Sequence, residues 1–187
     1  MTSREPYVPG PASGAEVKKD GDAWTLVLVR NLSHPPEKVW KALTEPEHLR
    51  AWAPFDSDRS LAALGTAKLT TLGAPPERAV SETRVKRADA PRALEYAWGG
   101  GDIRWELEPI GAGGSGTRLT LWANINRAYI AMGAAGWHVC FDVLARLLAD
   151  APIGRIAGQD AFKVDGFQRL IAEYGKHFGV DPPKWAG

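Results

Sequence analysis

His138 and Asp142 are the two side chains whose spacing could best support metal chemistry, because they lie four residues apart in a segment with helical periodicity. A helix can present two residues at that spacing to one metal ion. They fall on the face opposite the apolar residues of the segment, and no third ligand is close in sequence. We therefore interpret them as a surface pair, and we predict neither a metal site nor a cofactor.

The remaining groups that could perform catalysis have simpler structural interpretations. His34 precedes the first of two predicted short helices, where capping or simple exposure is expected, and His48 lies on the polar side of the second. His177 falls in the last turn of a final helix, where the helix dipole favours it. None of them has the neighbours of an activated nucleophile. Cys140 shares an apolar helix face, which is typical of a packed thiol. The run Gly99–Gly101 lacks the residues of a phosphate-binding loop, so we assign no catalytic residue.

Large aromatic side chains give a stronger indication of function, since ligand pockets are mainly apolar with a few polar groups. Any one of them could simply fill the core. The Tyr96 hydroxyl and the indole N–H groups could supply polar contacts. Arg30 could hold an anionic ligand or pair with an acidic neighbour, and we expect the latter. We predict that a ligand is contacted by Trp52, Phe55, Tyr96, Trp98, Trp105, Trp137, Cys140, Phe141 and Leu144.

The composition excludes several functional classes. The 187 residues carry 23 basic and 22 acidic side chains, so the balance of charge gives no sign of nucleic-acid binding. The single cysteine excludes an intrachain disulfide and fits a reducing compartment. The first residues do not resemble a secretory signal, and no stretch approaches the ~20 apolar residues of a membrane span. We expect a soluble, cytoplasmic protein.

The pattern of hydrophobic and turn residues predicts three parts of the chain. Residues 1–14 are a flexible or extended tail, residues 15–152 form the main domain, and residues 153–187 form a helical extension. Strands with short turns predict one curved antiparallel sheet, and Thr44 with Glu47 has the spacing of a capping box between two short helices. Strands are predicted at 15–19, 24–32, 64–72, 79–87, 92–98, 103–110 and 117–126, and helices at 35–52, 129–151 and 161–178.

Four segments resemble a known family: PPEKVWKALTEPEHLRAW from Pro35, RALEYAW from Arg92, TRLTLW from Thr117 and GWHVCFDVL from Gly136. They are similar to the START-like (SRPBCC) superfamily, and within it to the family of homologues of the activator of heat-shock-protein-ninety ATPase. The resemblance covers about residues 24–151. It implies an α+β helix-grip fold, in which a curved antiparallel sheet wraps around a long C-terminal helix. It also implies a hydrophobic cavity beneath that helix.

Three functions are compatible with this resemblance. The one we favour is binding of a hydrophobic or amphipathic small molecule in the cavity between the sheet and the helix. An enzyme resembling a polyketide cyclase or a hydrolase could use the same cavity, but it would need an ionisable group that points inwards. The third function is a module that regulates a chaperone ATPase. The final helix could cap the domain or pair with a second copy to form a homodimer.

Overall fold

The computed structural model describes residues 6–73 and 79–181, and a six-stranded antiparallel sheet is its largest element. The strands follow the order β1-β2-β9-β8-β7-β6 across the sheet. Five of them match predicted strands, whereas the short β6 was not predicted. Their bounds are Ala15–Asp20 (β1), Ala23–Leu32 (β2), Arg87–Asp89 (β6), Ala93–Trp98 (β7), Gly101–Ile110 (β8) and Gly116–Asn124 (β9).

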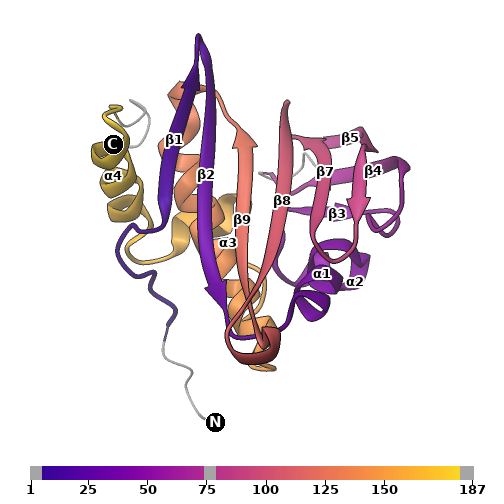
Figure 1. The fold of residues 1–187 in the computed structure, drawn as a ribbon. Coiled ribbons are helices and arrows are strands. Elements are labelled where there is room, and N and C mark those ends of the chain that lie inside the picture. The colour runs from indigo at the N-terminus through magenta and orange to yellow at the C-terminus, as the bar shows by residue number, and fades with distance from the viewer. Residues whose placement is uncertain (1–5, 74–78, 182–187) are drawn as a thin grey trace.

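A second sheet contains the three strands β3 (Phe55–Ser57), β4 (Gly65–Thr71) and β5 (Ala79–Val85) (Figure 1). The strands that we predicted as one sheet are therefore divided between two. A side chain joins the sheets, because the Ala97 N–H of β7 donates to Thr83 Oγ1 of β5 at 3.0 Å. After β5 the chain continues into β6 on the main sheet.

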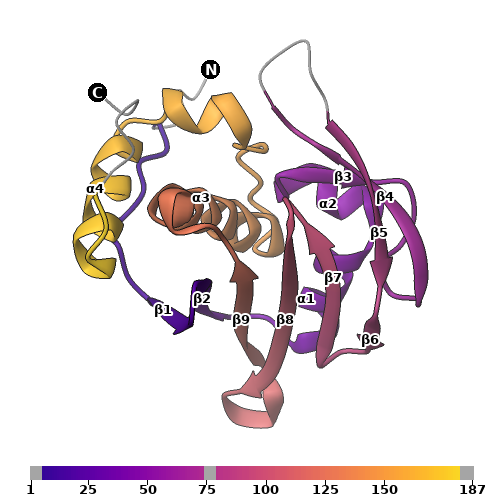
Figure 2. The same ribbon diagram turned by 90° about the horizontal axis from the view of Figure 1, so that it is seen from above.

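The helices cover one side of the main sheet, which curves around α3 (Figure 2). Helix α4 lies on the side of α3 away from the sheet. The predicted α+β architecture is confirmed. The helices are α1 (Pro36–Thr44), α2 (Pro46–Trp52), α3 (Ile130–Leu148) and α4 (Phe167–Phe178), with short 3₁₀ turns at Ala112–Gly114, Arg127–Tyr129 and Gly158–Lys163.

The predicted capping box between α1 and α2 is wrong. The Thr44 hydroxyl donates to the Trp40 carbonyl at 2.8 Å, one turn earlier in its own helix. Glu45 occupies the N-cap of α2 and makes no capping bond with its side chain. Pro46 at the first helical position fixes φ near the helical value, which can begin a helix without such a bond.

Helix α3 is covered on both faces, contrary to the prediction of one face in water. Its apolar stripe meets the sheet, while His138 on the opposite face is only 3% exposed because α4 lies over it. Residues Arg127–Leu148 also have the length and composition of a membrane span, contrary to the prediction that no stretch comes close to one. Most of this segment is buried inside the protein, as expected for a core helix.

Candidate functional site

A pocket of about 620 Å³ lies between the main sheet and the N-terminal half of α3. The sheet contributes Ile103 and Ala123, which are direct partners on β8 and β9. The turn between β7 and β8 and the end of β4 form further parts of the wall. Segment 156–162, which follows α3, closes another side with all of its residues except Asp160. The pocket is thus built from segments that are far apart in the sequence.

Helix α3 presents one stripe to this pocket, with Met132, Gly133, Gly136, Trp137 and Cys140 at helical spacing. A Cβ atom built on Gly136 would meet nothing within 4 Å, whereas one on Gly133 would lie 2.8 Å from Ile125 Cδ1. The absent side chain at Gly136 therefore leaves room on the pocket side of the helix.

The aromatic residues selected from the sequence come together in one network. Trp137 is its centre, since its ring centroid lies 5.5 Å from those of both Trp98 and Trp105 and 6.5 Å from those of Trp52 and Phe141. Phe55 extends the network from Trp98.

Only part of this predicted set lines the pocket itself. Trp98, Trp137 and Cys140 are in its wall. The other six predicted residues do not line this pocket and pack behind the wall in the core, where each is at most 1% exposed: Trp52, Phe55, Tyr96, Trp105, Phe141 and Leu144. The periodicity of a strand or helix predicts that a residue points inwards, but it does not predict how deep the residue lies.

Three of the indole N–H groups that were predicted as polar contacts for a ligand donate hydrogen bonds to other residues of the protein. Trp105 Nε1 donates to the Tyr96 hydroxyl at 3.0 Å, and Trp52 Nε1 donates to the Ala42 carbonyl at 2.8 Å. Trp98 Nε1 donates to Thr71 Oγ1 at 2.9 Å. Thr71 lines the pocket and accepts in that bond, so it retains its own hydroxyl proton to donate.

The pocket wall is electrically neutral over the residues that the structure describes, with no Asp, Glu, Lys, Arg or His among them. Cys140 and Tyr129 are the titratable residues of this described wall. Burial raises the pKa of the Cys140 thiol to about 12. The thiol is therefore protonated at neutral pH and is a poor nucleophile.

The segment after α3 forms a wall of the pocket that was not predicted. Ile156, Ala157 and Phe162 line the pocket from this segment. An ion pair between Arg155 and Asp56 of β3, at 2.5 Å, ties it to the second sheet. Gly158 fits closely against the chain after β4, since a Cβ there would lie 2.7 Å from the Leu72 carbonyl oxygen.

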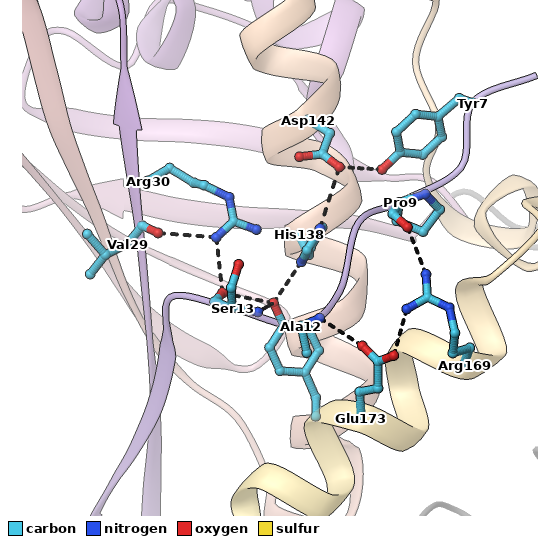
Figure 3. Close-up of polar contacts among 11 residues, drawn as sticks. Tyr7, Pro9, Ala12, Ser13, Val29, Arg30, His138, Asp142, Arg169 and Glu173 are labelled. Atoms are coloured by element: carbon cyan, nitrogen blue, oxygen red, sulfur yellow. Dashed lines mark hydrogen bonds and ion pairs between the residues drawn. The ribbon is translucent and has the colours of Figure 1, made fainter. Parts of the chain in front are cut away.

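A separate polar cluster lies between α3, α4 and the N-terminal segment (Figure 3). His138 Nδ1 is 2.7 Å from the Tyr174 hydroxyl, and His138 Nε2 is 3.5 Å from Asp142 Oδ2. The Tyr7 hydroxyl donates to the same Asp142 oxygen at 2.6 Å. Burial is the main cause that lowers the pKa of His138 to about 4, with the nearby Arg30 guanidinium adding to the effect. The interpretation of His138 and Asp142 as a surface pair is therefore wrong.

The N-terminal segment runs in an extended path beside α4 (Figure 3). The Ala12 N–H donates to the Glu173 carboxylate at 2.8 Å, and Arg169 donates to the Pro9 carbonyl at 2.7 Å. Residues 6–14 thus join α4 to the rest of the domain.

Arg30 lies on the same side of β2 as the buried leucines and points into the polar cluster. The acidic partner that we expected is replaced by two backbone carbonyls, those of Ser13 and Val29. Within residues 6–73 and 79–181, no three His, Cys, Asp or Glu side chains are grouped so that they could hold a metal ion. The hydrogen bonds of this cluster join the N-terminal segment, α3 and α4, so we interpret the cluster as structural.

Solved structures share this fold. A conserved protein of unknown function from Enterococcus faecalis, EF2215, has 17% identity and a TM-score of 0.67, with 87% of this chain and 89% of that chain covered. CalU16 from Micromonospora echinospora, in its crystal structure, has 18% identity and a TM-score of 0.60, with 92% and 97% covered. The 92% of this chain that CalU16 covers leaves fewer residues unmatched than segment 150–187 contains. The match therefore includes part of the segment that follows α3.

Sequence comparison identifies the family. A search of curated proteins gave no match. The family model described as "Activator of Hsp90 ATPase homolog 1-like protein" matches residues 33–149, from the start of α1 to the end of α3. This range contains the pocket stripe of α3 but ends before the wall at residues 156–162. The chain therefore belongs to the family of Activator of Hsp90 ATPase homolog 1-like proteins, within the START-like superfamily.

Proposed function

We propose that this protein binds an apolar small molecule in the pocket between the main sheet and α3. The observation that carries the proposal is the pocket of about 620 Å³ with Trp98 and Trp137 in its wall. Pockets for small molecules in proteins have volumes of about 300–1,000 Å³ and mainly apolar linings. Burial of a ligand the size of two aromatic rings at ~25 cal/mol per Å² supports a dissociation constant on the order of micromolar after ordering costs.

The chemistry of the wall supports binding more than catalysis. General acid–base catalysis needs a group that exchanges a proton near the working pH. The Cys140 pKa of about 12 is far from that range. Tyr129 is half exposed, so it meets water instead of being held against a buried ligand.

The proposal can be tested with N-phenyl-1-naphthylamine, a neutral apolar probe whose emission rises in apolar surroundings. Titration should raise probe emission and quench tryptophan emission, because Trp98 and Trp137 lie in the wall. Gly136→Leu should remove both changes by filling the pocket, while Gly136→Ala should retain a folded protein and weaken binding less. Probe binding that is unchanged in Gly136→Leu would contradict the proposal.

A further inference from the structure

The described wall of the pocket favours ligands that are uncharged as well as largely apolar. It offers hydrogen-bonding groups, but those of its side chains are neutral, such as the Thr71 hydroxyl and the amides of Asn126 and Gln159. Arg155, the basic residue that precedes Ile156 of the wall, is engaged with Asp56. A charged ligand group would lose its hydration without gaining an opposite charge from these residues.

The dipole of α3 is the main opposing effect, since the first turn of this helix lies at the pocket and favours an anion there. A negative charge at a helix N-terminus typically binds roughly two- to fivefold more tightly than it would without the dipole. Burial of an unpaired carboxylate costs far more than this advantage returns. The balance therefore remains against an anion, and the dipole makes a cation even less favourable.

The shape of the site favours a ring system. Trp98 and Trp137 meet with an angle of 78° between their ring planes, so the wall has two aromatic surfaces nearly at right angles. Gly99, Gly100 and Gly136 add stretches of wall without side chains, and a Cβ on any of the three would meet nothing within 4 Å. A flat ligand can approach the backbone closely at such places.

We infer that the natural ligand is an uncharged, ring-containing molecule whose polar groups are neutral hydrogen-bonding groups such as hydroxyl, carbonyl or amide. This inference rests on the proposed binding function. It extends that function by excluding carboxylates, phosphates and ammonium compounds from the favoured class.

Two matched pairs of probes test the inference with the full chain at pH 7. The first pair is 2-naphthamide and 2-naphthoate, and the second is 2-naphthylmethanol and 2-naphthylmethylammonium. Each pair keeps the ring system and changes the charge. Isothermal titration calorimetry should give a dissociation constant at least tenfold larger for each charged member than for its neutral partner.

Gly136→Leu distinguishes binding in the pocket from binding elsewhere, because only pocket binding should be lost in this variant. If the leucine variant does not fold, the weaker binding expected of Gly136→Ala makes the same distinction. A charged probe that binds in the pocket within tenfold of its neutral partner overturns the inference but leaves the proposed function intact. If neither neutral probe binds in the pocket, the proposed function fails together with the inference. A charged probe whose binding persists in Gly136→Leu occupies another place and agrees with the inference.

Discussion

Gly136 shows how one residue can favour a pocket over stability. A glycine inside a helix destabilises it relative to alanine by about 1 kcal/mol, because the unfolded glycine has more conformational freedom. Nothing in the described structure would collide with a methyl group at this position. The glycine is thus not required by packing, and its effect is to keep one side of the pocket open.

Gly136→Ala should therefore stabilise the protein by up to about 1 kcal/mol and raise its melting temperature by about 2–4 °C. Thermal unfolding followed by circular dichroism measures this change. Gly133→Ala is the matched control in the same helix, and it should gain less because Ile125 must move. A melting temperature for Gly136→Ala below that of the unchanged protein would contradict the open space beside Gly136.

His138 should make stability depend on pH. Its pKa is about 4 in the folded protein and near 6.5 when unfolded, so the unfolded state binds more protons between these values. Stability should fall as the pH falls from 6.5 to 4, by roughly 3 kcal/mol from this residue. The groups that face it are Arg30 on β2, Asp142 on α3, Tyr174, Arg169 and Glu173 on α4 and Tyr7 on the N-terminal segment.

Urea unfolding of the unchanged protein and of His138→Gln at pH 7 and pH 4.5 isolates this contribution. Glutamine does not titrate, so the stability advantage of histidine should shrink towards the lower pH. An advantage that is equal at both values would contradict the assigned pKa shift.

The polar cluster also marks a limit of sequence analysis at the residue scale. The spacing of His138 and Asp142 predicts that they share a helix face, and they do. Whether that face meets water depends on α4, a segment about thirty residues further along the chain. The burial of Arg30 could have been predicted from the sequence, because it alternates in phase with Leu26 and Leu28 on the buried face of its strand.

At the scale of elements, the wall formed by residues 156–162 depends on how the segment is attached. The Arg155–Asp56 pair has 20% of each side chain exposed, so it lies between a surface pair and a buried one. Arg155→Leu should cost about 1–2 kcal/mol of stability. It should also weaken binding of N-phenyl-1-naphthylamine several-fold, because one wall becomes less ordered.

Hydrogen exchange across residues 153–162, together with probe titration, measures both effects. Lys163→Ala is a suitable control, because it breaks the exposed Lys163–Asp160 pair in the same segment and should change stability by less than about 0.5 kcal/mol. Equal effects of the two substitutions on probe binding would mean that the Arg155 pair does not hold the wall.

The longer strands and the helices were well predicted, because alternation and helical periodicity are local properties of the sequence, whereas the three-residue strands β3 and β6 are too short to show such a pattern. Ile103, Trp105 and Leu107 alternate with polar residues and all three are buried. The division into two sheets was not predicted, since it depends on where β5 leaves its partner and β6 begins. The wall at residues 156–162 has no regular periodicity, so no local pattern indicated its contact with the pocket.

For the whole molecule, the extension after α3 should be required for folding. Four α4 side chains are at most 2% exposed: Phe167, Leu170, Ile171 and Tyr174. Each contributes about 1.5–3 kcal/mol by burial, and their sum approaches the 5–15 kcal/mol that typically stabilises a protein. A chain that ends at Pro152 should therefore lose its cooperative thermal transition.

Point substitutions in the full chain provide the graded comparison. Ile171→Ala should destabilise by about 2–5 kcal/mol, whereas Gln168→Ala on the exposed face should change stability by less than about 0.5 kcal/mol. A truncated chain that melts cooperatively near the temperature of the full protein would show that residues 15–152 are an independent folding unit.

The wall at residues 156–162 has a consequence for how ligand preference can change. It lies outside the range that the family model matches, yet it touches the same pocket as Trp137. Substitutions at Ile156, Ala157 or Phe162 can reshape the site without altering a strand of the main sheet. Under the proposed binding function, ligand preference can therefore change through one short connection while the strands of the main sheet stay the same.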